Sequence, residues 1–129
     1  MSNTIGLYIH IPFCKSKCPY CDFFSGRASE NDYDNYIKTL SDNISLWSTK
    51  TDKAVSSVYF GGGTPSILGA ERLSLLLNKI KEEFSVADNA EITVEVNPDS
   101  GKTLDFDLLK LTGFNRISVG IQSAVEQEL

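Results

Sequence analysis

The sequence lacks the features that mark membrane-spanning, secreted and nucleic-acid-binding proteins. No apolar run approaches the roughly 18 residues that a membrane-spanning helix needs. The N-terminus has no basic start followed by a long apolar stretch, so a secretory signal peptide is not expected. Acidic residues outnumber basic ones by 17 to 12, and a net charge of −5 argues against a broad nucleic-acid footprint. These absences predict a cytoplasmic protein with no membrane span and no nucleic-acid partner.

Cysteine is scarce, and the few cysteines lie together. The 129 residues contain only three, Cys14, Cys18 and Cys21, spaced C-x-x-x-C-x-x-C in one run. In a cytoplasmic chain, an odd number of clustered cysteines favours metal or redox chemistry over disulfide bonds. Because many metal centres prefer four ligands, three thiolates would leave one position open for a cofactor or a substrate.

Two kinds of metal centre are compatible with three such thiolates. Zinc could take His10, the only histidine, as its fourth ligand. A 4Fe–4S cluster is normally held by four cysteines, so three would leave one iron exposed. His10 precedes Pro12 on a predicted strand, and zinc loops more often use paired C-x-x-C hairpins. The spacing therefore favours the cluster, while His10 itself can be either a structural or a functional residue.

Strands alternate with helices along the chain. Apolar patterning predicts strands over residues 5–11, 55–60, 91–96 and 116–121. It predicts helices over residues 32–47 and 104–111, with residues 26–31 as a loop. A helix between these two carries the apolar residues Leu73, Leu76, Leu77, Ile80 and Phe84. The apolar stripe of the first helix consists of Tyr33, Tyr36, Ile37, Leu40, Ile44 and Trp47. We expect Thr103 to cap the last helix at its start and Gly113 to end it. This order implies an α/β fold of right-handed βαβ units with parallel strands, in one domain or part of one.

Unusual residues follow each of the four predicted strands. The cysteine run follows the first strand, Gly61 to Gly63 the second, Asn97 the third and Gln122 the fourth. In parallel α/β folds, functional residues gather at the carboxyl ends of the strands, which meet at one edge of the sheet. The coincidence of four strands predicts a site at this edge more strongly than any single motif does.

The glycine run is suited to the close approach of a ligand. Gly61, Gly62 and Gly63 remove three side chains where the second strand ends, and they permit positive φ angles. A tight turn is the plainer explanation, but it would need fewer glycines. Thr64 adds a hydroxyl group. No Gly-Lys-Ser or Gly-Lys-Thr follows, so the run is not a phosphate-binding P-loop.

Side chains on the neighbouring strands could complete such a site. Glu95 alternates with buried residues near the end of the third strand, and its carboxylate could accept hydrogen bonds from a ligand amine or ribose hydroxyls. Tyr8 and His10 share a face of the first strand and point toward the same edge. Taken alone, Glu95 and Gln122 would be ordinary solvated residues. They suggest a site only because they occur together with the other residues at the strand ends.

Five segments together resemble the radical S-adenosylmethionine (radical SAM) superfamily, and within it the haem chaperone and oxygen-independent coproporphyrinogen III oxidase family. They are Leu7 to Cys14, Cys18 to Phe23, Tyr59 to Ser66, Val94 to Asp99 and Gly113 to Ser123. The segments occur in the family's order and cover nearly the whole chain. The fold that the resemblance implies is the first part of a partial (β/α)6 barrel.

The resemblance also implies two cofactors. Cys14, Cys18 and Cys21 would each bind one iron of a 4Fe–4S cluster, and the fourth iron would bind S-adenosylmethionine. The positions that match cofactor-binding residues of the family are Tyr8, Tyr20, Gly62, Gly63, Thr64, Glu95 and Gln122. No catalytic residue is assigned, because the cofactor supplies the chemistry and the protein positions it.

One departure from the pattern separates the two branches of this family. The pattern of the oxidase branch is C-x-x-x-C-x-x-C-x-C, whereas this chain has Phe23 at the position of the fourth cysteine. The sequence therefore resembles the haem chaperone branch, which implies haem or a porphyrin and an electron donor as partners. Coproporphyrinogen III oxidation is one alternative, and a zinc-stabilised binding module without redox chemistry is another.

The second departure is length. The resemblance implies a barrel of six βα units followed by a C-terminal domain. Residues 1–129 supply about three and a half such units. We expect the chain to be the N-terminal part of a radical SAM core with no second domain. The resemblance alone does not decide whether such a part is an active enzyme.

Overall fold

The described chain folds as a parallel sheet with helices between its strands. The computed structural model describes residues 3–13, 29–98 and 103–119. The sheet contains β1 (Thr4–Ile11), β2 (Ala54–Gly62), β3 (Val86–Val96) and β4 (Arg116–Val119), in that spatial order and all parallel. The connections hold α1 (Glu30–Ser48), the short 3₁₀ helix η2 (Pro65–Leu68), α2 (Gly69–Glu83) and α4 (Phe106–Thr112). This arrangement confirms the predicted α/β fold with parallel strands.

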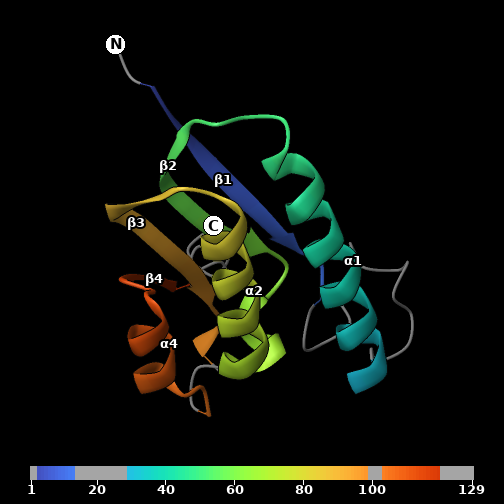
Figure 1. Cartoon of the computed structure of the whole chain (residues 1–129). Helices are drawn as coiled ribbons and strands as arrows, with labels where there is room; N and C mark the ends of the chain where they lie inside the picture. Colours follow the sequence, from blue (N-terminus) through green and yellow to red (C-terminus); the bar gives the residue numbers. More distant parts are fainter. Residues whose placement is uncertain (1–2, 14–28, 99–102, 120–129) are drawn as a thin grey trace, which may run out of the picture.

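The three α-helices lie together in front of one face of the sheet (Figure 1). Right-handed crossovers between consecutive strands place every helix on the same side, as the sequence order 1-2-3-4 requires. The core between the two layers is apolar. Its most deeply buried members are Ile11, Val55, Val58, Phe60, Leu73, Leu76, Leu77, Ile80, Val94 and Leu109.

The opposite face of the sheet has a different character. The cross-strand row of β1, β2, β3 and β4 reads Tyr8, Tyr59, Thr93 and Arg116 on this face. Glu95 follows one alternation further along β3. Polar and aromatic side chains here replace the aliphatic ones of the helix-covered face, so this face is suited to a polar ligand rather than to a second helix layer.

Helix α1 begins earlier than the sequence predicted. Ser29 caps it, since the Ser29 hydroxyl accepts from the Asp32 N–H at 3.1 Å and the Asp32 carboxylate accepts from the Ser29 N–H at 2.8 Å. The predicted loop over residues 26–31 is therefore wrong at Glu30 and Asn31, and residues 26–28 lie outside the described part. Trp47 was predicted on the buried stripe, but it is 63% exposed because the last turn of α1 extends past the core.

Further element boundaries differ from the predictions. Asp105, not Thr103, caps α4, and its side chain accepts from the Leu108 N–H at 3.0 Å. Gly113 ends α4 as predicted, at a φ of 132°. Helix α2 ends one residue before Phe84, and β3 begins at Val86 rather than at residue 91. Strand β4 is described to Val119, so the last two residues of its predicted range lie outside the described part.

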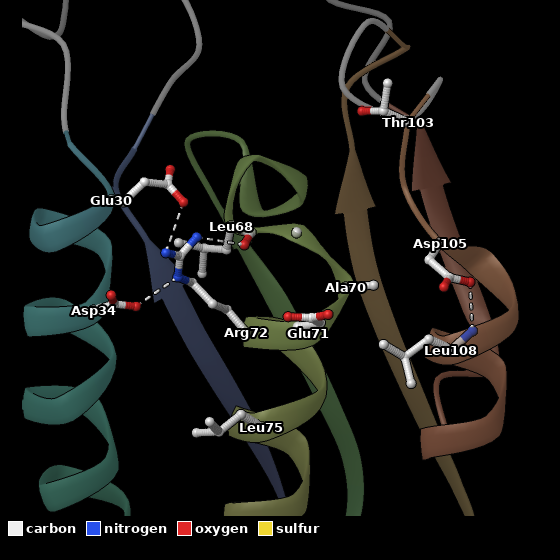
Figure 2. Close-up of a pocket in the computed structure, with 11 residues that line it drawn as sticks. Glu30, Asp34, Leu68, Ala70, Glu71, Arg72, Leu75, Thr103, Asp105 and Leu108 are labelled. Atoms are coloured by element: carbon white, nitrogen blue, oxygen red, sulfur yellow. Dashed lines mark hydrogen bonds and ion pairs between the residues drawn. The ribbon is translucent and has the colours of Figure 1, made fainter.

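Arg72 joins α2 to α1. Its guanidinium donates to Glu30 Oε1 at 3.0 Å, to Asp34 Oδ1 at 2.9 Å and to the Leu68 carbonyl at 3.3 Å (Figure 2). The same group lies 5.3 Å from the centre of the Tyr33 ring. These contacts fix the start of α1 beside the start of α2, at the carboxyl end of the strands.

The first strand is tied to α1 along its outer side. The Ile11 carbonyl faces β2, because it accepts from the Gly63 N–H at 2.7 Å. The preceding carbonyl, that of His10, points the other way and accepts a hydrogen bond from the Tyr36 hydroxyl. A side chain of α1 thus takes the place that a strand partner would occupy.

Candidate functional site

The carboxyl ends of β1, β2 and β3 bring the predicted site residues together. The parallel register sets His10 beside Gly61 and Ile11 beside Gly62. Glu95 reaches the same place from β3, since its carboxylate contacts the Gly62 N–H. Of the residues that the sequence predicted for the cofactor, Tyr8, Gly62, Gly63, Thr64 and Glu95 are described and lie at this end of the sheet.

The glycine run passes too close to β1 to carry side chains. Gly62 has a φ of 116°, and a Cβ there would lie 2.7 Å from His10 Nδ1 and 2.8 Å from the Ile11 carbonyl oxygen. The next two amides continue the attachment. The Gly63 N–H donates to the Ile11 carbonyl and the Thr64 N–H to the Phe13 carbonyl, both at 2.7 Å. A ligand at this turn would therefore meet bare backbone held in a fixed position.

Two donors on β2 hold the Glu95 carboxylate. The Tyr59 hydroxyl donates to Oε2 at 2.8 Å, and the Gly62 N–H donates to Oε1 at 3.2 Å. The hydrogen bond to Glu95, together with burial, raises the pKa of Tyr59, while Ser118 and Arg116 act in the opposite direction. Among the described residues each carboxylate oxygen has one such donor, and an ionised carboxylate oxygen can accept more than one hydrogen bond. The group is thus a fixed anionic acceptor at the edge of the sheet.

Tyr8 presents an exposed ring next to this carboxylate. Its side chain is 58% exposed, and its ring stacks on Tyr59 with centres 6.0 Å apart and an interplanar angle of 17°. The Tyr8 hydroxyl lies 3.4 Å from His10 Nδ1. Partial burial, and then the Glu95 charge, raise the pKa of the Tyr8 hydroxyl, which keeps it protonated. Tyr8 and Tyr59 form an aromatic surface beside an acceptor group.

The described part of the chain that precedes the cysteine run ends next to the glycine turn, at Phe13. Cys14, Cys18, Cys21, Tyr20 and Gln122 all lie outside the described residues, so the structure leaves their predicted roles as predictions. Phe13, the last described residue before the run, is held at the glycine turn because its carbonyl accepts from the Thr64 N–H. In residues 3–13, 29–98 and 103–119, no three His, Cys, Asp or Glu side chains form a group that could hold a metal ion.

Tyr59 is a site residue that the sequence analysis did not single out. A signal for it was present, because Val58 and Phe60 are apolar neighbours and alternation turns Tyr59 to the face of Tyr8 and Glu95. Only the strand register shows that its hydroxyl meets the Glu95 carboxylate.

A hollow of about 490 Å³ lies outside this site, at the starts of the helices (Figure 2). Arg72 sits in it and pairs with the carboxylates of Glu30 and Asp34. Glu71 and Asp105 also line it. Because the hollow belongs to the helix layer and Glu95 to the opposite face of the sheet, it is separate from the candidate site. Among the described helices, none combines the length and apolarity required to cross a membrane.

Comparison with known proteins identifies the family. The sequence model described as "Radical SAM superfamily" matches residues 8–127. The chain is 38% identical over 131 residues to the heme chaperone HemW of Mycobacterium tuberculosis, covering 98% of this chain and 34% of that protein. It is 38% identical over 129 residues to the heme chaperone HemW of Escherichia coli K12, covering 97% and 34%.

A solved structure shares the fold. Coproporphyrinogen III oxidase (HemN) from Escherichia coli, described as a radical SAM enzyme, matches with a TM-score of 0.77 and 31% identity. The match covers 93% of this chain and 28% of that one. The chain thus spans about a third of the length of the curated relatives that it matches. The match over residues 8–127 and the shared fold show that this chain belongs to the radical SAM superfamily.

Proposed function

We propose that this chain is the N-terminal part of a radical SAM core that binds a 4Fe–4S cluster and S-adenosylmethionine, in a protein that resembles the haem chaperones. The observation that carries the proposal is the Glu95 carboxylate, held between Tyr59 and Gly62 at the carboxyl edge of the sheet. Membership of the superfamily implies both cofactors.

The cluster would be held by Cys14, Cys18 and Cys21. Three thiolates with one open position suit an iron–sulfur cluster that must also bind a small molecule. The attachment of Phe13 to Thr64 at the carboxyl edge of the sheet supports a cluster on the same side as Glu95. Family membership favours this centre over the zinc site that the cysteine spacing also allowed.

The described residues fit the amino-acid end of S-adenosylmethionine. The Glu95 carboxylate, which has acceptor capacity beyond its two described donors, suits a small ammonium group at this edge of the sheet. Gly63 and Thr64 would continue the contact surface, with Tyr20 and Gln122 as further proposed contacts. When bound, the cluster and the cofactor supply one-electron radical chemistry.

The chain's own residues would bind and orient the cofactor. Glu95 would accept hydrogen bonds from the ammonium group, and the Gly62 N–H would hold the carboxylate in place. The exposed Tyr8 ring would pack against an apolar or planar part of the ligand. The stacked pair of Tyr8 and Tyr59 would exclude water from one side of the carboxylate.

Haem or a porphyrin is the partner that we propose for the whole protein. Relatives at 38% identity carry the name heme chaperone. Phe23 also stands where the oxidase pattern has its fourth cysteine. Coproporphyrinogen III oxidation is the second candidate, which the structural likeness to an oxidase supports. In both cases an external electron donor would reduce the cluster.

Anaerobic reconstitution with iron and sulfide tests the proposal. We expect about four irons per chain and a broad visible absorption band that shifts when S-adenosylmethionine is added. Cys18→Ser should abolish iron uptake, whereas Ser48→Ala, on the last turn of α1, should leave it unchanged. A folded chain that takes up zinc but no iron would contradict the proposal.

A further inference from the structure

The Glu95 carboxylate is useful only if it points toward the ligand, and one residue outside the predicted site controls its direction. We propose that Tyr59 is a positioning residue that orients the Glu95 carboxylate toward the ammonium group of S-adenosylmethionine. This inference rests on the proposed function, because it names a determinant of the same binding site.

The contacts of Glu95 define its orientation from two sides. Tyr59 Oη lies 2.8 Å from Oε2, and the Gly62 amide nitrogen lies 3.2 Å from Oε1. The terminal torsion of a glutamate side chain is otherwise broad, so a carboxylate with one donor can rotate. With a donor on each oxygen the plane of the carboxylate is set, and the remaining lone pairs keep one direction.

Tyr59 is itself well held, which makes it a suitable support. Its side chain is half-buried, its ring stacks on Tyr8, and its neighbour across the sheet, Thr93, is fully buried. A tyrosine has few rotatable bonds, so little conformational freedom is lost when its hydroxyl is placed. The pKa of Tyr59 is raised by its hydrogen bond to Glu95 and by burial, so the hydroxyl stays protonated and remains a donor.

The contribution of the two donors is unequal. The bond from Tyr59 is shorter than the bond from Gly62, and it comes from a hydroxyl whose own position is fixed by ring stacking. Without the Tyr59 hydroxyl the carboxylate would have to be ordered when the ligand binds, and ordering one flexible side chain corresponds to roughly threefold to tenfold in affinity. Loss of the Tyr59 hydroxyl should therefore weaken binding measurably while Gly62 remains in place.

The test compares two ligands on the reconstituted full chain by isothermal titration calorimetry. S-adenosylmethionine carries the ammonium group, and 5′-methylthioadenosine lacks the whole amino-acid portion. Tyr59→Phe should weaken S-adenosylmethionine binding by roughly threefold to tenfold and change 5′-methylthioadenosine binding by less than about twofold. Tyr33→Phe, a buried tyrosine in the helix layer, is the matched control and should change neither.

A second measurement needs no cofactor. In chain labelled with 3-fluorotyrosine, Glu95→Gln should lower the pKa of Tyr59 because the anionic acceptor is gone, and it should leave the Tyr33 resonance unchanged. An equal loss of affinity for both ligands in Tyr59→Phe would show a merely structural role and overturn the inference. An unchanged affinity for S-adenosylmethionine, or an unchanged Tyr59 titration, would also overturn it. If the wild-type chain binds no S-adenosylmethionine, the proposed function fails and this inference fails with it, whereas binding by the wild type with no effect of Tyr59→Phe refutes this inference alone.

Discussion

Replacement of Gly62 by alanine should destabilise the fold for two separable reasons. Gly62 has a φ of 116°, a conformation that costs a residue with a Cβ roughly 1–3 kcal/mol. The added methyl would also lie 2.8 Å from the Ile11 carbonyl oxygen and 2.7 Å from His10 Nδ1. The imidazole can rotate away, but the carbonyl belongs to β1 and accepts from the Gly63 N–H. Forced contacts of this kind cost about 1–3 kcal/mol more, so we expect a total of about 2–6 kcal/mol.

Gly69 provides the control that separates the two causes. It has a φ of 85° and a ψ of 159°, a conformation almost confined to glycine, yet no described heavy atom lies within 4 Å of the position that its Cβ would take. Gly69→Ala should therefore lower the free energy of unfolding only by the backbone cost of roughly 1–3 kcal/mol. Urea unfolding followed by circular dichroism gives both free energies. If Gly62→Ala destabilises the chain no more than Gly69→Ala does, the close approach of β2 to the end of β1 is not what requires glycine.

Three further predictions address the helix layer and the site. Arg72→Ala should lower the free energy of unfolding by about 1 kcal/mol, because the partly buried guanidinium bridges two helices, and the effect should be smaller in high salt. Arg116→Ala removes an exposed ion pair and should cost under about 0.5 kcal/mol in the same urea experiment. Asp105→Ala should cost about 1 kcal/mol through loss of the α4 cap, whereas Asp105→Asn, which keeps an oxygen that can accept from the Leu108 N–H, should cost clearly less; equal costs would contradict the observed cap. Because the pKa of Tyr59 is raised in the folded state, the contribution of Tyr59 to stability should be complete below about pH 10 and lost as the pH rises through the folded pKa. Above about pH 10 the free energy of unfolding should therefore fall less steeply with pH in Tyr59→Phe than in the wild type. An unchanged slope would refute this reasoning.

The order and direction of the strands could be predicted because they follow from local patterns. Alternation of apolar residues marks each strand, intervening helices force parallel pairing, and parallel pairing brings the strand ends to one edge. Tyr8, Gly62 and Glu95 could therefore be assigned to one site from sequence. The contact between Tyr59 and Glu95 could not, because it depends on the register of β2 against β3 and on a side-chain rotamer.

The predictions that were wrong each have a physical reason. Ser29 lies in a polar stretch that suggests a loop, although the serine and the aspartate three residues later form a capping box. Trp47 continues the apolar period of α1, but periodicity does not show where the partner layer ends. Thr103 and Asp105 are both good capping residues, and only tertiary packing decides which of them starts α4.

The hydrogen bond from Tyr36 to the His10 carbonyl bears on how this sheet avoids unwanted association. In the described sheet β1 is an outer strand, and the open carbonyls of an outer strand can recruit a strand from another molecule. The phenol on α1 occupies one such acceptor, the His10 carbonyl near the end of β1. An added strand would have to displace that hydroxyl and move α1 aside. The packing of α1 on β1 thus hinders the addition of a strand from another molecule at this edge. It does so at the end of the sheet that carries the candidate site.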